Sequence, residues 1–133
     1  MLITVDFDGT LDKPDITKFI IDKIKEGHRA YVVTSRLSEK RANREYGQNL
    51  NRWNSDVIEL SEKVGISKIF FTNYERKVGL IRKLTPDLHL DDDGGEVSEI
   101  NSEVPETLAL DIKRSNWKQT ANELLDKEKL GFY

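Results

Sequence analysis

Acidic residues stand where two short apolar segments of the 133-residue chain end. The first set is Asp6 and Asp8, and the second is Asp91, Asp92 and Asp93. Carboxylates a few ångströms apart raise each other's pKa values, and a divalent cation relieves that cost. Because the chain has no cysteine and two histidines, the ligands would be oxygen atoms, which favour a hard cation such as Mg²⁺.

Hydroxyl, guanidinium and ammonium groups stand at further segment ends. Thr34, Ser35 and Arg36 follow the apolar residues 30–33, and Lys77 lies at the predicted start of a helix. In an open parallel sheet, ligands bind beyond the carboxyl ends of the strands, where the strand order reverses. We therefore expect these groups and the aspartates to meet at one sheet edge, where a cation would neutralise both the carboxylates and a bound phosphate.

The elements that must position these groups follow from the apolar periodicity. Short buried strands are predicted over residues 2–7, 30–33, 69–71, 88–90 and 107–110. Helices are predicted over residues 16–24, 78–84 and 116–129, and residues 38–64 form a long, polar, mostly helical stretch with a break around 51–55. This alternation predicts one α/β domain over residues 1–133, a three-layer Rossmann-like parallel sheet of about five strands with helices on both faces.

The segment around the first aspartates, residues 6–10 (Asp-Phe-Asp-Gly-Thr), resembles the first signature of the haloacid dehalogenase superfamily. The apolar strand that ends in Thr34 is similar to the second signature, and Lys77 to the third. The acidic pair at 91–92, with Glu96 a few residues on, resembles the fourth. The four segments occur in the family's order between residue 2 and about residue 111, which makes the resemblance much more specific than any one of them.

The resemblance implies a phosphatase, a phosphoric monoester hydrolase that forms an aspartyl-phosphate. Asp6 would attack phosphorus and bind Mg²⁺. Asp8 would protonate the leaving oxygen, later activate water, and offer its backbone carbonyl to the metal. An acid at Asp8 favours ester hydrolysis, because dehalogenase members lack an acid there and transport ATPases carry threonine. Asp6 should be ionised and Asp8 available as an acid, so their environments should separate their pKa values.

The remaining roles that the resemblance implies concern the phosphate and the metal. Thr34 would bind a phosphoryl oxygen, together with backbone N–H groups next to it at Ser35 and Arg36. Lys77 would hold Asp6 and the transferring phosphoryl group. Gly9 would let the chain turn sharply beside the phosphate. The metal shell would be completed by Asp92, with Asp91 as a second ligand or as an orienter of metal-bound water.

Simpler interpretations exist for each motif. Asp-Gly after a strand is an ordinary turn, and Thr34 is a residue type that commonly caps a helix. Lys83 and Lys68 are rivals of Lys77. Asp93 with the two glycines after it is an acidic turn rather than a calcium loop, because no regular alternation of oxygen ligands follows.

Two other functions fit the same motifs. The domain could bind phosphate or a phosphoprotein without turnover. It could also be a phosphoacceptor receiver, but receivers carry the phosphorylated aspartate after the third strand, where this chain has Thr72-Asn73.

The substrate is less well defined by the sequence. No segment is long enough for a sizeable cap domain, so the site is expected to be open or covered by a small helical projection near residues 46–53.

The basic residues that follow Thr34 could steer polyanions or form a solvated helix face; they are Arg36, Lys40, Arg41 and Arg44. A net charge of −3 gives general nucleic-acid binding no support. A phosphorylated small molecule or nucleotide is favoured over a protein, with a nucleic-acid end as a narrower alternative.

The cellular setting is expected to be the cytoplasm. The chain lacks an apolar run of transmembrane length, and the strand-like residues 2–5 stand where a signal peptide would carry a basic region. Membrane partners are not expected, and a homo-oligomer is possible.

Overall fold

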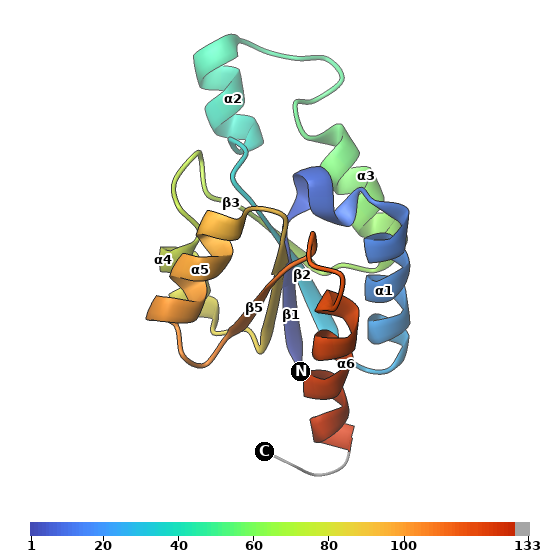
Figure 1. Cartoon of the computed structure of the whole chain (residues 1–133). Coiled ribbons are helices and arrows are strands. Elements are labelled where there is room, and N and C mark those ends of the chain that lie inside the picture. The colour runs from blue at the N-terminus through green and yellow to red at the C-terminus, as the bar shows by residue number, and fades with distance from the viewer. Residues whose placement is uncertain (130–133) are drawn as a thin grey trace.

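The computed structural model describes residues 1–129 and contains a five-stranded, all-parallel sheet. The strands are β1 (Leu2–Val5), β2 (Arg29–Thr34), β3 (Lys68–Phe71), β4 (Leu88–Asp91) and β5 (Leu108–Asp111). Their order across the sheet is β3-β2-β1-β4-β5 (Figure 1). The central strands consist largely of buried, β-branched or leucine residues, as expected of strands that are covered on both faces.

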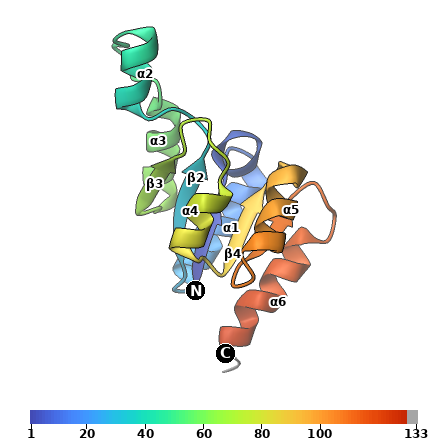
Figure 2. The ribbon, with the colours of Figure 1, turned by 90° about the vertical axis from the view of Figure 1, so that its left-hand side faces the viewer.

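Helices cover both faces of the sheet (Figure 2), which confirms the predicted three-layer Rossmann-like α/β fold. One face packs against α1 (Pro14–Lys25), α3 (Ser55–Val64) and α6 (Trp117–Lys129). The other face packs against α4 (Val78–Leu84) and α5 (Gly94–Glu103). Within residues 1–129, no helix combines the length and the apolar character needed to cross a membrane.

The helix α5 was not predicted from the sequence. Asp93 begins it as a side-chain cap, because one carboxylate oxygen accepts hydrogen bonds from the backbone N–H groups of Gly95 (2.9 Å) and Glu96 (3.1 Å). The prediction of an acidic turn at Asp93 and the two glycines was therefore wrong: Gly94 and Gly95 are the first residues of α5, and Asp93 is its cap. Its buried face consists mainly of Val97 and Ile100, too few apolar positions to make a clear periodic pattern.

The polar stretch 38–64 is mostly helical with a break, as predicted, and forms two helices. The helix α2 (Glu39–Tyr46) begins at Ser38, whose side chain accepts a hydrogen bond from the Arg41 backbone N–H. Residues 47–54 form the connection to α3, a longer and earlier break than predicted. Figures 1 and 2 show α2 as a helical projection that stands away from the sheet and its flanking helices. The projection was expected near residues 46–53, but the helix lies earlier in the chain and ends at Gly47 (φ +90°), so residues 47–54 contain no helix.

Packing of α6 against the sheet provides a test of the core. Leu125 is almost fully buried, whereas the adjacent Leu124 is only partly buried. Leu125→Ala should lower the free energy of unfolding by about 2–5 kcal/mol, because it removes apolar contacts and leaves a cavity. Leu124→Ala should cost clearly less. Urea denaturation of both variants measures the difference, and equal losses would contradict this placement of α6.

Candidate active site at the carboxyl ends of β1 and β4

The topology brings the two acidic segments together. From β1 the chain proceeds outward to β2 and β3, and then returns to place β4 on the other side of β1. The strand order therefore reverses between β1 and β4, where ligands bind in open parallel sheets. The Asp6 backbone N–H donates to the Leu90 carbonyl (2.9 Å), which ties the two strand ends directly.

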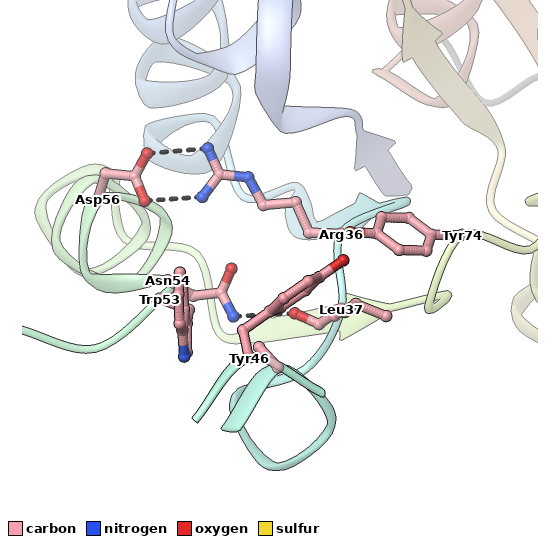
Figure 3. Close-up of a pocket in the computed structure, with 8 residues that line it drawn as sticks. Arg36, Leu37, Tyr46, Trp53, Asn54, Asp56 and Tyr74 are labelled. Carbon is pink, nitrogen blue, oxygen red and sulfur yellow. Dashed lines mark hydrogen bonds and ion pairs between the residues drawn. The ribbon is translucent and has the colours of Figure 1, made fainter. Parts of the chain in front are cut away.

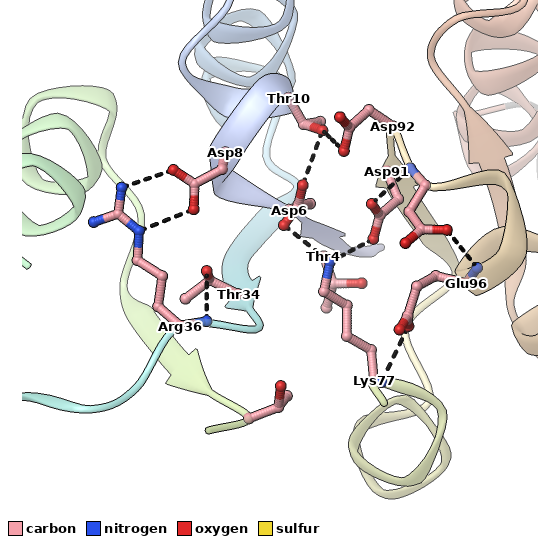
Figure 4. A network of polar contacts seen from close by, with 12 residues as sticks. Thr4, Asp6, Asp8, Thr10, Thr34, Arg36, Lys77, Asp91, Asp92 and Glu96 are labelled. Carbon is pink, nitrogen blue, oxygen red and sulfur yellow. Dashed lines mark hydrogen bonds and ion pairs between the residues drawn. The ribbon is translucent and has the colours of Figure 1, made fainter. Parts of the chain in front are cut away.

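Three carboxylates meet at this point (Figure 4). One oxygen each of Asp6, Asp91 and Asp92 lies within 4.8 Å of the other two. Asp6 and Asp91 are buried and Asp92 is half-buried, so the open side of the group is at Asp92. An oxygen-only set of this kind could hold a hard divalent cation such as Mg²⁺.

Lys77 lies against this group. Its ammonium nitrogen donates to Asp6 Oδ1 (2.9 Å) and to Asp91 Oδ2 (2.7 Å), and its side chain is only 4% exposed. Of the three candidate lysines, the structure brings Lys77 into the group. Lys68 lies over the Tyr31 ring instead, and Lys83 is exposed on α4.

Glu96 positions Lys77 rather than joining the three aspartates. One of its carboxylate oxygens accepts a hydrogen bond from the Lys77 backbone N–H (3.1 Å), and the other is 3.4 Å from the guanidinium of Arg76. The acid noted after the aspartate pair in the sequence is therefore buried on α5, where it fixes the start of α4.

The two buried carboxylates differ in their electrostatics. Burial raises the pKa of Asp6 to about 7, with Lys77 opposing this shift and Asp91 adding to it. Burial also acts to raise the pKa of Asp91, but the hydrogen bond from His89 and the charge of Lys77 outweigh it and hold that pKa at about 2. Asp91 is therefore the constant partner of Lys77, whereas full ionisation of Asp6 at neutral pH needs a further positive charge.

A buried polar chain supports Asp91 from inside the sheet. His89 Nε2 lies 2.9 Å from Asp91 Oδ2, and His89 Nδ1 lies 2.8 Å from the Thr4 hydroxyl of the neighbouring strand. Sequence analysis missed this support. The available signal was the i, i+2 spacing of His89 and Asp91, which places both side chains on one face of β4.

Thr10 and Gly9 shape the opposite side of the group. The Thr10 hydroxyl is buried and can donate to Asp6 Oδ2 (3.2 Å) or Asp92 Oδ1 (3.4 Å). Gly9 has φ +76°, and a Cβ at this position would lie 2.5 Å from Asp92 Oδ2. Glycine is thus required for the backbone conformation and for the close approach of Asp92.

Asp8 lies on the same loop, but its side chain points away from the three aspartates toward Arg36 (Figure 4). The Arg36 guanidinium donates to both oxygens of Asp8 (2.9 and 2.7 Å) and to both oxygens of Asp56 (2.8 and 2.9 Å). Asp56, at the start of α3, had not been singled out from the sequence. The Asp8 side chain is outside the cation-binding group, and the contribution expected from its backbone carbonyl stays a prediction.

The end of β2 contributes Thr34 and Ser35. The Thr34 hydroxyl is buried and accepts a hydrogen bond from the Arg36 backbone N–H (3.3 Å). Ser35 is exposed, and its carbonyl accepts from the Tyr74 backbone N–H (2.7 Å). Because Ser38 caps α2, Thr34 is not occupied by that role.

Comparison with known proteins adds no assignment: no protein-family model matches the chain, and no curated protein matches it significantly. The class is therefore defined by the fold and the site alone. It is a Rossmann-like α/β protein with a lysine-bound aspartate cluster at the reversal of strand order.

Asp6 should make stability in cation-free buffer fall as the pH rises. The pKa of Asp6 is about 7 in the folded protein, above the ordinary value of 3.8. Between these two pH values the folded state therefore binds more protons than the unfolded state, and the stability that this proton binding adds is lost by pH 8. Asn cannot ionise. The stability of Asp6→Asn relative to wild type should therefore grow by about 2–4 kcal/mol between pH 4 and pH 8.

Urea denaturation with a chelator at both pH values measures this difference. Asp15→Asn, an exposed substitution on α1, retains Asp6 and should show the wild-type pH dependence. Parallel pH profiles for Asp6→Asn and wild type would contradict the burial of an ionisable group at this place.

Gly9→Ala should weaken divalent-cation binding, because the new methyl group displaces the Asp92 carboxylate. The left-handed backbone adds a cost, so we also expect about 1–3 kcal/mol of destabilisation. Titration calorimetry with Mg²⁺ and thermal unfolding measure the two effects. Gly79→Ala is the matched control, since Gly79 is helical with open space around it. Wild-type Mg²⁺ affinity in Gly9→Ala would overturn the prediction.

Proposed function

We propose that this protein is a Mg²⁺-dependent phosphatase that hydrolyses a phosphate monoester through an aspartyl-phosphate on Asp6. The observation that carries the proposal is the buried Lys77 ammonium, which bonds to Asp6 and Asp91 beside Asp92. A carboxylate nucleophile, a fixed positive charge and an oxygen donor set thus stand together. The resemblance to the haloacid dehalogenase superfamily supports the same activity, and a cytoplasmic setting is part of the proposal.

In the first step, an Asp6 carboxylate oxygen attacks phosphorus, and the bond from phosphorus to the ester oxygen breaks. A bound Mg²⁺, held by Asp6, Asp92 and Asp91, would supply the charge that cancels repulsion between the carboxylate and the phosphate dianion. Lys77 adds a fixed positive charge next to Asp6, which favours the ionised carboxylate and the charge that develops on the transferring group.

The leaving oxygen takes a proton from Asp8, which lies two residues beyond the nucleophile. In the structure both oxygens of Asp8 accept from Arg36, so Asp8 must exchange this partner for the leaving oxygen during turnover. The pair is partly exposed, which keeps the cost of the exchange small.

In the second step, water attacks the phosphorus of the aspartyl-phosphate. Asp8 takes a proton from the water, the bond from phosphorus to Asp6 breaks, and inorganic phosphate leaves. The Thr34 hydroxyl and the Ser35 backbone N–H are the proposed donors to the phosphoryl oxygens. The Arg36 N–H, expected from the sequence to be a third donor, donates to the Thr34 hydroxyl instead and orients it. Both carboxylates then return to their starting states.

A second candidate function is phosphate-ester binding without turnover. The specific observation that favours it is the double ion pair of Arg36, which occupies the proposed acid Asp8 and connects it to Asp56 on α3. A protein in which this pair never opens would bind a cation and a phosphate but would lack the proton donor.

Activity toward p-nitrophenyl phosphate, with Mg²⁺ or with a chelator, tests the proposal. Wild type should be active only with the cation. Asp6→Asn and Lys77→Met should lower kcat/KM by at least about 10²-fold, since they remove the nucleophile and its charge partner. Asp12→Asn, an exposed aspartate on the same loop, should retain activity. Persistent turnover by Asp6→Asn rejects the nucleophile, and an inactive wild type favours the binder.

The role of Asp8 is tested by comparing two leaving groups. Asp8→Asn should lower kcat/KM by about 10²–10⁴-fold for an alkyl phosphate, which needs protonation of its leaving oxygen. The loss should be smaller for p-nitrophenyl phosphate, because its phenolate leaves without a proton. The same loss with both esters would show that Asp8 does not act as the acid. Mg²⁺ affinity should be largely retained, because the backbone carbonyl remains.

A further inference from the structure

A pocket of about 560 Å³ adjoins the candidate active site on the side of the helical projection (Figure 3). Helix α2, the start of α3 and the loop after β3 form its walls. The lining residues are Arg36, Leu37, Ala42, Tyr46, Trp53, Asn54, Asp56 and Tyr74. Its volume falls within the range of about 300–1,000 Å³ typical of small-molecule sites.

Three aromatic side chains dominate this aromatic pocket, and they are more exposed than packing residues of their size. Tyr46 is 60% exposed, Tyr74 67% and Trp53 37%. The Tyr46 and Trp53 rings are 5.8 Å apart and inclined at 55°, and a hydrogen bond with Tyr74 raises the pKa of the Tyr46 hydroxyl. Rings that gather around an open space, rather than in the core, offer flat faces to a ligand.

The backbone holds Tyr74 at the pocket against its own conformational preference. Asn73 and Tyr74 have φ values of +54° and +69°, a left-handed conformation that non-glycine residues seldom adopt. The Tyr74 N–H donates to the Ser35 carbonyl (2.7 Å), and the Asn73 N–H donates to that of Arg36 (3.2 Å). The Asn73 side chain also accepts from the Ser38 N–H (2.9 Å). Strain maintained by this many contacts is characteristic of functional positions.

The aromatic pocket is connected to the catalytic loop through Arg36. This side chain lines the pocket and donates to both oxygens of Asp8, so one charged residue contacts both the pocket and the loop that carries Asp6 and Asp8. Asn54 is only 1% exposed and supports the pocket wall from inside, where its amide nitrogen donates to the Leu37 carbonyl (3.0 Å; Figure 3). The polar groups of the lining that can contact the edge of a ring are the tyrosine hydroxyls and the Arg36 guanidinium.

We infer that the aromatic pocket binds the nucleobase of a phosphate ester, with the phosphate of the same molecule at Asp6. A nucleobase has π-faces that stack on aromatic rings and polar edges that match hydroxyl and guanidinium groups. A sugar phosphate without a base would leave the exposed faces of the three rings uncovered. The inference rests on the proposed function for the phosphate end of the ligand. It identifies the substrate class as nucleoside monophosphates, or the terminal nucleotide of an oligonucleotide.

Binding of the base is tested without any turnover. The chain has two tryptophans, Trp53 in the pocket and Trp117, which is buried on α6 against Phe19 of α1 and does not line the pocket. Titration of the wild-type protein with adenosine and cytidine should shift the indole N–H NMR signal of Trp53 and leave that of Trp117 in place. Ribose should shift neither, and Trp53→Phe assigns the two signals.

Specificity is tested by comparing kcat/KM for a nucleoside monophosphate and for ribose 5-phosphate. The nucleotide should be preferred by about 5- to 100-fold, the value of one or two stacking contacts. Tyr74→Leu should remove most of the preference by acting on the nucleotide alone, whereas Tyr74→Phe retains the ring and should keep it. Leu50→Ser is the control, since Leu50 is fully exposed on the same projection and does not line the pocket.

The outcomes separate this inference from the proposed function. A Trp53 signal that nucleosides do not move, or equal kcat/KM for nucleotide and ribose 5-phosphate in an active enzyme, overturns the nucleobase site and leaves the phosphatase intact. A Trp53 shift in a protein without phosphatase activity supports the nucleobase site and overturns the phosphatase. Activity on a 5′-phosphorylated oligonucleotide beside the mononucleotide distinguishes the two sources of the base.

Discussion

The ion pairs of the buried Lys77 ammonium with Asp6 and Asp91 determine the arrangement of the whole site. A charge that is removed from water needs partners, and loss of one partner of a buried pair typically costs about 3–5 kcal/mol. The pairs join three segments far apart in the sequence: the end of β1, the start of α4 and the end of β4. Two carboxylates share one ammonium in this arrangement, and a third stands beside them, so the site has an excess of negative charge. A bound cation would balance that excess.

The second constraint is topological. Asp6 and Asp91 can meet because β4 returns to the centre of the sheet and pairs with β1, and the edge strands β3 and β5 lie outside. Support from within the sheet depends on the same pairing, since His89 on β4 bonds to Thr4 on β1 as well as to Asp91. The projection formed by α2 lies outside this framework. Substitutions in α2 can therefore change the surroundings of the site without disturbing the aspartates and Lys77. The aromatic pocket is partly lined by α2.

Much of the fold could be predicted from the sequence, because its strands are short, apolar and separated by helical periodicity. The helix over residues 78–84 was predicted with its observed bounds, and all five strands within a few residues. The helix α5 was missed, because its stability comes from the cap at Asp93 and from packing rather than from a strong apolar pattern. The reversal of strand order also explains why strand-end residues 85 positions apart could be expected to meet.

The sequence predicted which residues form the candidate site better than it predicted the contacts that each of them makes. Lys77, Asp6, Asp91 and Asp92 converge as expected, but the partners that hold them depend on tertiary distances that no local pattern encodes. Arg36 had been considered as a phosphate-binding or steering residue, whereas it binds Asp8 and Asp56. Glu96 had been noted only as the acid that follows the aspartate pair in the fourth signature, whereas it holds the Lys77 backbone. These pairings needed coordinates, because several acids compete for each basic group.

Chemical trapping of the proposed aspartyl-phosphate is the most decisive measurement. The protein would be quenched in acid during turnover of a phosphate monoester with Mg²⁺ and then treated with sodium borohydride, which reduces an aspartyl-phosphate to homoserine. Peptide mapping should find homoserine at position 6, in an amount that depends on the substrate. Turnover that leaves position 6 unmodified, or modification at another aspartate, would contradict the account.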